Sequence, residues 1–210
     1  MGLKELGIGL IAVLTVLAVV ALIGISTIGG IYNSMVQADN SVAAHWGNVQ
    51  SVYQRRAELV PNLVATVQGS ANFEQSTLTK IAQYRSQAGT AGQSVANAQP
   101  GDTDAVNAAD TQMESAISRL LVVVEAYPTI QSTQAFRDLQ SQLEGTENRV
   151  KYERDEYNTE VQNYKNTLQT FPNNIIAGMF NFNANKWKMF AATDTAQTAP
   201  TVVFNITGSG

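Results

Sequence analysis

The chain has 210 residues, a formal net charge of -4 and no cysteine. This length suits one domain of ordinary size with an appendage better than two large domains. The acidic balance argues against a nucleic-acid-binding protein, because such proteins need a dense basic face to neutralise phosphates. The lack of cysteine excludes disulfides, thiolate nucleophiles, cysteine-ligated zinc and iron–sulfur clusters.

The N-terminal segment carries the features of a membrane-spanning helix. Residues 8–31 contain no charged side chain and consist mostly of Ile, Leu, Val, Ala and Gly. An apolar helix of this length can cross a hydrocarbon core about 30 Å thick. We therefore expect residues 1–31 to form a transmembrane helix that contacts the lipid membrane through residues 8–31.

Two other interpretations of this segment are weaker. A cleaved signal peptide has an apolar stretch of about 7–15 residues followed by a small-residue cleavage site, whereas this run is longer and has no clear site. A buried core helix would have to hide an all-round apolar surface inside an otherwise polar domain.

The charges that flank the apolar run predict its orientation. Lys4 and the amino terminus lie on one side, and no Lys or Arg follows until Arg55. The positive-inside rule then places the N-terminus in the cytoplasm and the C-terminal body outside.

From residue 32 onward the apolar residues are spaced as in long helices. Stripes with steps of three and four run over residues 46–67 and 106–127, and a third places apolar residues at intervals of seven over residues 136–171. A helix of about 40 residues is about 60 Å long, so the other helices must lie along it. We predict an all-α fold, an elongated antiparallel bundle of long helices over residues 32–172.

Three interruptions of the pattern predict where helices end or bend. Residues 86–104 are rich in Gly, Ala, Ser, Gln and Asn, and we expect a flexible connection there. Pro61 lies inside the first stripe and removes a backbone donor, which predicts a kink or a break. Pro128 ends the second stripe and predicts a tight turn between two helices.

The sequence shows no catalytic, cofactor-binding or metal-binding motif. His45 is the only histidine, and no second ligand or triad partner accompanies it. The sequence also lacks Glu-x-x-His pairs of di-iron bundles, an Asp-rich calcium loop and a phosphate-binding Gly-Lys-Ser/Thr motif. We expect a protein that is not an enzyme and that holds neither a cofactor nor a metal.

Polar residues inside the apolar stripes are more informative. Arg56 occupies a core position of the first stripe, and Thr146 and Glu153 fall where the third stripe should present apolar side chains. A buried arginine needs a carboxylate, because removing one partner of a buried ion pair costs about 3–5 kcal/mol. We predict an ion-pair layer in which Arg56 faces Glu147 or Glu153. Such a layer can fix the register of the helices, or it can form a site for a ligand or partner.

Large apolar residues gather again after the third stripe. They are Ile175, Ile176, Met179, Phe180, Phe182, Trp187, Met189 and Phe190. These side chains need cover from the bundle, from a neighbouring subunit or from the membrane interface. Because this aromatic-rich C-terminal segment and tail, residues 173–210, lack the continuous basic face of an interfacial helix, we expect cover by the bundle or a neighbouring subunit.

Several sequence blocks resemble those of the LemA family. The longest are Arg55-Arg56-Ala57-Glu58-Leu59-Val60-Pro61-Asn62-Leu63-Val64, Val122-Val123-Val124-Glu125-Ala126-Tyr127-Pro128 and Leu143-Glu144-Gly145-Thr146-Glu147-Asn148-Arg149. The resemblance implies a bacterial helical bundle on one N-terminal membrane helix, in a family with no agreed molecular activity. It also implies a link to membrane organisation, since the family is similar to a protein involved in building magnetosome membranes.

These features together favour a non-enzymatic structural or scaffolding protein, anchored in the bacterial cell membrane and self-assembling there as a homo-oligomer. The alternative is an adaptor or sensor that binds a small ligand or a membrane protein partner through its helical bundle. A third hypothesis, a hydrolase, has no assembled site in the sequence.

Overall fold

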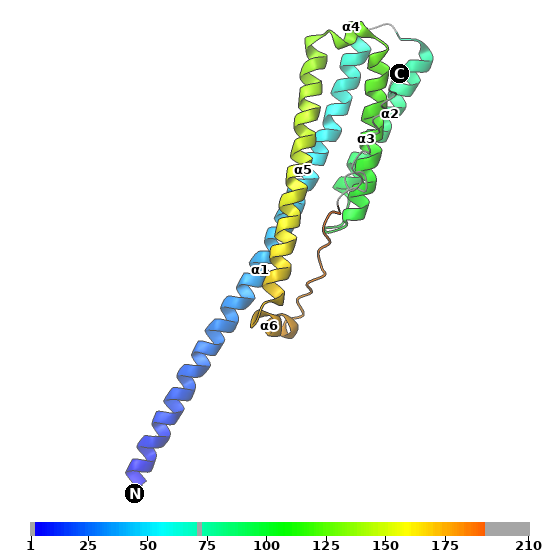
Figure 1. Cartoon of the computed structure of the whole chain (residues 1–210). Coiled ribbons are helices and arrows are strands. Elements are labelled where there is room, and N and C mark those ends of the chain that lie inside the picture. The colour runs from blue at the N-terminus through cyan, green and yellow to red at the C-terminus, as the bar shows by residue number, and fades with distance from the viewer. Residues whose placement is uncertain (1–2, 71–72, 192–210) are drawn as a thin grey trace, which may run out of the picture.

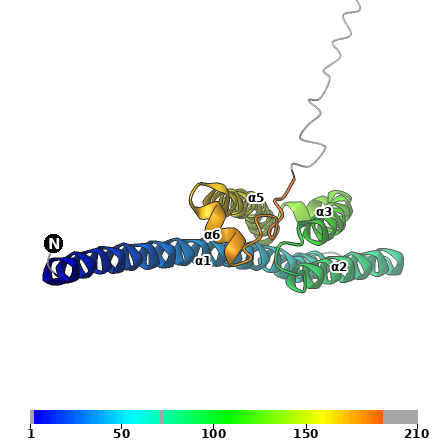
Figure 2. The ribbon, with the colours of Figure 1, turned by 90° about the horizontal axis from the view of Figure 1, so that it is seen from below.

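The computed structural model of the chain describes residues 3–70 and 73–191 (Figure 1). Within these residues the chain forms α1 (Leu3–Ser70), α2 (Gln75–Ala96), α3 (Thr103–Glu125), α4 (Pro128–Gln131), α5 (Gln134–Gln169) and α6 (Asn173–Met179). Helices α1, α2, α3 and α5 form an elongated antiparallel bundle, with α4 at the end far from the N-terminus and α6 beside α1 and α5 at the other end (Figures 1 and 2). The predicted all-α fold is confirmed.

The longest helix, α1, joins the apolar N-terminal segment to the bundle. Its N-terminal part projects alone from the bundle and is long and apolar enough to cross a membrane (Figure 1). The large apolar side chains between Leu10 and Ile28 are all exposed, whereas Met35 is fully buried. The 68 residues of α1 span about 100 Å at 1.5 Å per residue. The apolar segment and the first bundle helix are therefore one continuous helix.

Pro61 does not break this helix. Helix α1 continues past it to Ser70, and Val60, Leu63 and Val64 next to it are buried in the bundle core. The predicted break is therefore wrong. Packing of an apolar face contributes more to helix stability in a folded protein than local propensity does, and here it offsets the lost hydrogen bond.

The flexible connection predicted at residues 86–104 is also wrong for most of its length. Helix α2 continues to Ala96, so only residues 97–102 join it to α3. The small residues that suggested a loop instead allow close packing. A Cβ atom added to Gly92 would lie 2.5 Å from the Cβ of Ala57, so this glycine lets α2 approach α1. The turn predicted at Pro128 is confirmed, with the single-turn α4 inside it.

The apolar stripes predicted from spacing form the bundle core. Every member of the first stripe is buried: Trp46, Val49, Tyr53, Arg56, Val60, Leu63 and Val67. On the third stripe, Val150, Tyr157 and Tyr164 are buried, and so are the polar residues Thr146 and Glu153. The core therefore contains charged groups in the middle of a continuous apolar seam.

After α6 the chain turns back along the bundle and reaches the start of α3 (Figures 1 and 2). Burial of the aromatic-rich segment against the bundle is confirmed for Ile176, Trp187 and Phe190. Ile175 and Met179 are exposed, so the described residues of the chain do not bury them. Residues 192–210 of the predicted tail lie outside the described residues.

Candidate functional site: the polar layer of the bundle

Arg56 is the centre of a polar layer that joins three helices. It lies on α1, and its side chain is only 6% exposed. One guanidinium nitrogen, Nη1, donates to Oδ1 of Asp110 on α3 at 2.7 Å, and the other, Nη2, lies 2.7 Å from Oε2 of Glu147 on α5. Because a guanidinium presents its donors in a rigid planar fork, these contacts fix how the three helices are placed against one another.

The second carboxylate oxygen of Asp110 contacts a different arginine, Arg154. Nη1 of Arg154, on α5, donates to Oδ2 of Asp110 at 3.2 Å and to the Tyr53 hydroxyl at 3.4 Å. Nη2 of Arg154 donates to Oδ1 of Asn107 at 2.6 Å. The Asp110 carboxylate is thus held between two guanidinium groups, one from α1 and one from α5.

The charges of Arg56, Asp110, Glu147 and Arg154 balance one another. Desolvation of an ion is costly, and it is offset here because each buried charge has a partner of opposite sign and further hydrogen bonds. Burial, together with the nearby Asp110 carboxylate, raises the pKa of the Tyr53 hydroxyl well above its ordinary value. Tyr53 therefore stays a neutral phenol in the layer.

The residues predicted for this layer divide between two ion pairs. Glu147 contacts Arg56, which is one of the two alternatives that we predicted. Glu153 is buried but pairs with Arg149 on the same helix, its Oε1 lying 2.7 Å from Arg149 Nη2. The sequence reasoning missed Asp110 and Arg154 as partners. Asp110 lies inside the second apolar stripe, so the rule that singled out Arg56 would have found it.

A second polar cluster ties the end of the described chain to the bundle. We call residues 186–190 the C-terminal clasp. Lys186 Nζ lies 2.6 Å from Oδ2 of Asp39 on α1, and Trp187 Nε1 donates to Oδ1 of Asp39 at 2.8 Å. The Lys188 ammonium pairs with Asp104 at the start of α3. The clasp therefore bridges α1 and α3.

Helix α5 holds the backbone of the clasp. The Tyr157 hydroxyl donates to the Lys188 carbonyl at 3.0 Å. The Asn158 side chain accepts from the Phe190 N–H at 2.8 Å and donates to the Phe190 carbonyl at 3.0 Å. The Phe190 ring stacks on Trp46 at 6.1 Å, and the guanidinium of Arg154 lies 4.5 Å from its centroid. Arg154 thus connects the clasp to the polar layer.

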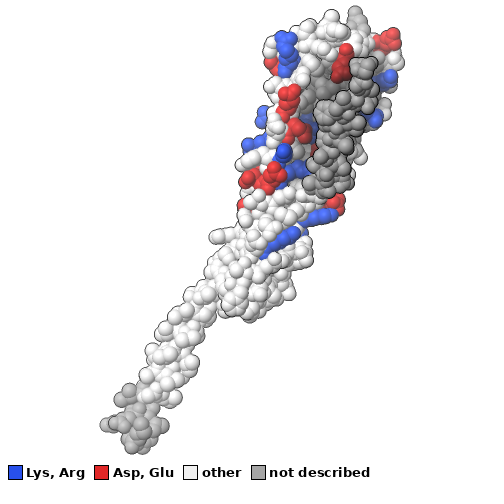
Figure 3. Space-filling view, viewed as in Figure 1, with Lys and Arg blue, Asp and Glu red and all other residues white. Residues whose placement is uncertain are grey.

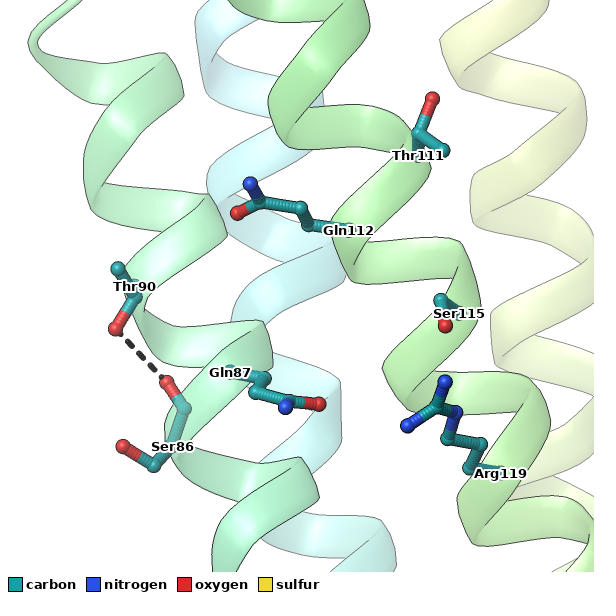
Figure 4. Close-up of a pocket in the computed structure, with 7 residues that line it drawn as sticks. All are labelled: Ser86, Gln87, Thr90, Thr111, Gln112, Ser115 and Arg119. Atoms are coloured by element: carbon teal, nitrogen blue, oxygen red, sulfur yellow. Dashed lines mark hydrogen bonds between the residues drawn. The ribbon is translucent and has the colours of Figure 1, made fainter.

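The surface of the bundle has grooves between neighbouring helices. One lies between α2 and α3 and is lined by Ser86, Gln87, Thr90, Thr111, Gln112, Ser115 and Arg119, which come from the two facing helices (Figure 4). Another lies between α1 and α5 and is lined by Ser51, Val52, Arg55, Gln142, Gly145, Thr146 and Arg149. In residues 3–70 and 73–191, no three His, Asp or Glu side chains gather as they would around a metal ion.

Comparison with known proteins identifies the family. The sequence profile of the LemA family matches residues 45–204, which contain the whole polar layer and the clasp. This chain belongs to the LemA family. The LemA-family chain is similar to Magnetosome protein MamQ 2 of Paramagnetospirillum magneticum, with 27% identity over 197 residues that cover 85% of this chain and 72% of that protein.

Two further relatives extend the comparison. Magnetosome protein MamQ of Magnetospirillum gryphiswaldense is 25% identical with the same coverage. Protein LemA of Metamycoplasma hominis is 23% identical over 145 residues, which cover 69% of the LemA-family chain and 63% of that protein. The family membership indicated by the sequence blocks is thereby confirmed.

Proposed function

We propose that this LemA-family chain is a structural protein, anchored in the bacterial cell membrane, that self-assembles there and organises lipid or other proteins. The observation that carries the proposal is the continuity of α1. One helix supplies both the exposed apolar segment and the buried core stripe of the bundle. Because no loop lies between the two, the direction of the bundle is tied to that of the anchor.

The length of α1 sets how far the bundle extends from the bilayer. Residues 32–70 of α1 span about 60 Å at 1.5 Å per residue. The polar layer and the clasp tie α3 and α5 to this helix at several levels. A long, internally braced body on a continuous anchor is suited to hold a surface at a set distance from the membrane.

The relatives support a role at a membrane. Two of them are named magnetosome proteins, and their similarity covers most of the LemA-family chain. We extend this to a membrane-associated role for the chain itself.

The orientation we propose has the N-terminus in the cytoplasm and the bundle outside, as the charges around the apolar run favour.

The groove between α2 and α3 is the surface we propose for self-assembly. Hydroxyl and glutamine side chains line both of its walls, and Arg119 is the charged residue among them (Figure 4). The small serines and threonines let a neighbouring helix approach, and the glutamines can hydrogen-bond to it. A second copy of the chain would thereby contact the bundle along α2 and α3.

The mass of the detergent-extracted, full-length particle tests the proposal. We expect a uniform homo-oligomer whose mass falls when Ser115→Arg places a long charged side chain in the groove. Ser141→Arg, a change of the same kind at an exposed site of α5 that lines neither groove, should leave the mass unchanged. A monomer that co-purifies with a different protein would instead favour the adaptor, and a monomer alone would exclude self-assembly.

A further inference from the structure

An exposed apolar patch lies at the anchor end of the bundle. We call Phe171, Ile175, Met179 and Phe180 the α6 patch; their side chains are between 48 and 76% exposed. Ile175 and Met179 are four residues apart on α6 and therefore share one face. Ile176 on the inner face is buried. Helix α6 thus has an apolar inner face packed on the bundle and an apolar outer face that no described residue covers.

Aromatic contacts fix the level of this patch along α1. The ring of Tyr32 on α1 lies 4.9 Å from the ring of Phe180 and 5.6 Å from that of Phe182. Tyr32 stands where the exposed apolar run of α1 ends, three residues before the fully buried Met35. The α6 patch therefore sits beside the point at which α1 leaves its apolar segment (Figures 1 and 2).

The thickness of a bilayer places Tyr32 and the α6 patch at the membrane surface. A hydrocarbon core about 30 Å thick takes up about 20 residues of helix, roughly from Gly9 to Ile28. Tyr32 then lies about 6 Å farther along the axis, in the headgroup layer, where tyrosine and tryptophan are enriched. The α6 patch at the level of Tyr32 faces the boundary between headgroups and acyl chains.

The part of the bundle around Tyr32 and the α6 patch also lacks charged residues. No Asp, Glu, Lys or Arg occurs in residues 6–38 or in residues 166–185, the two stretches that meet here. The surface around α6 and the adjoining part of α1 is accordingly free of charged side chains in the face shown in Figure 3, and charges begin above it. A contiguous apolar patch of this kind marks an interaction surface, and this one is continuous with the membrane anchor.

We propose that the α6 patch is a second membrane contact, resting in the interface of the same bilayer that α1 crosses. The inference rests on the membrane anchoring of α1 in the proposed function. The lack of a basic face, which in the sequence argued against the membrane interface, is offset here because packing against Tyr32 on α1 places the patch at the membrane surface. The contact is therefore made by apolar burial and does not need anionic lipid. Two contacts, α1 and α6, would set the tilt and the rotation of the bundle on the membrane, which α1 alone leaves free.

Single-cysteine spin labelling tests the proposal, because the chain has no cysteine of its own. The full chain is reconstituted in phosphatidylcholine vesicles with a label at Ile175→Cys or Met179→Cys. Collision rates of the label with oxygen, which concentrates in lipid, and with a water-soluble nickel chelate are measured. Val122→Cys, at an exposed apolar site near the end of α3, is the aqueous control, and Val20→Cys is the lipid control.

We expect the ratio of oxygen to nickel collisions at residues 175 and 179 to exceed that at residue 122 several-fold and to lie below that at residue 20. A ratio equal to that at residue 122 would overturn the lipid contact. Protection from both reagents, with dipolar broadening between labels, would show that a second copy covers the patch and would also overturn it. An aqueous ratio at residue 20 would refute the anchoring itself, which separates the two proposals. The fluorescence of the buried Trp46 and Trp187 checks that each variant is folded.

Discussion

Replacing Arg56 by alanine would test whether the polar layer holds the bundle together. The change removes a guanidinium that contacts a carboxylate on each of two other helices, both at 2.7 Å. The two carboxylates differ in how well water can replace the lost contact. The side chain of Asp110 is 17% exposed and that of Glu147 is 57% exposed.

The exposure of each partner determines the expected loss of stability. At Asp110 a hydrogen bond between charged groups is lost in a mostly buried setting, although Arg154 remains, and this costs about 1.5–3 kcal/mol. At Glu147 solvent screening reduces the contribution to about 0.2–1 kcal/mol. We therefore expect Arg56→Ala to lower the free energy of unfolding by about 2–4 kcal/mol.

Denaturant unfolding of the full-length protein in mild detergent measures this loss. Trp46 and Trp187 are both buried in the bundle, so their fluorescence reports on the bundle and not on the apolar N-terminal part of α1. The matched control is Arg55→Ala, the exposed arginine one residue earlier, for which we expect a change within about 0.5 kcal/mol.

Double-mutant cycles then identify the partner. The coupling free energy of Arg56 should be largest with Asp110, smaller with Glu147, and within about 0.5 kcal/mol of zero with Glu153. The last value follows because Glu153 pairs with Arg149. Equal effects of Arg56→Ala and Arg55→Ala, or a coupling with Glu153 larger than that with Asp110, would refute the reasoning.

Three further predictions concern other parts of the chain. Gly92→Ala should lower the free energy of unfolding by about 1–3 kcal/mol, because the added Cβ would lie 2.5 Å from the Cβ of Ala57 on α1. Gly89→Ala on the same helix is the control: its Cβ would meet nothing within 4 Å, so the change should be neutral or stabilising. Equal changes in the fluorescence unfolding curves of the two variants would contradict this prediction. Burial, with a smaller effect of Asp39, raises the pKa of Tyr164 to about 12 from an ordinary value of 10.0. The buried neutral tyrosine therefore contributes its full stabilisation below pH 10, and this contribution is lost as the pH rises towards 12. The stability advantage of the natural chain over Tyr164→Phe should shrink over that interval by up to about 1.4 kcal/mol per pH unit, and a constant difference would contradict the burial argument. A reporter that is active only outside the cytoplasm should be active when fused after Gly210; an inactive fusion with intact protein would reverse the orientation.

The long helices could be predicted from the sequence because large apolar residues recur at helical spacing wherever a helix buries one face. The region of α2 that was predicted as a loop shows the limit of this approach. Its buried residues are Ala88, Ala91, Gly92 and Val95, of which three are small. Small side chains give a weak hydrophobic pattern, although they allow the closest approach between helices. Only the position of α1 against them shows why this face is buried.

The partners in the polar layer were predictable in part for a similar reason. A charged residue in an apolar stripe must find an opposite charge, and this places Arg56 near carboxylates of other helices. Which carboxylate it meets depends on the rotation of each helix about its axis. Glu153 faces Arg149 within α5, and Asp110 faces Arg56 from α3. The spacing along one helix shows which of its faces is buried, but it does not show which residues of a neighbouring helix lie opposite that face.

The division of the aromatic-rich segment into buried and exposed residues also depends on tertiary structure. The composition of residues 175–190 shows that many apolar side chains need cover. It does not show that Trp187 is held by Asp39 while Ile175 faces away from the bundle. The level of Ile175 relative to α1 decides what can cover it, and that level appears only once the chain is folded.

The polar layer and the membrane end are linked by a series of direct contacts. Arg154 binds Asp110 in the layer and lies over the Phe190 ring of the clasp, which continues to the ion pair between Lys186 and Asp39 on α1. From Asp39 to the level of the α6 patch, α1 makes about two turns, or about 10 Å. These contacts weaken towards the membrane, because Lys186 is about half exposed whereas Arg154 is mostly buried, and exposed ion pairs contribute little. The ion pairs thus brace the polar layer more strongly than the α6 end of the bundle, so we expect local opening at the α6 end before opening of the layer. If α6 contacts lipid as we propose, that contact would supply the stabilisation that the ion pairs do not.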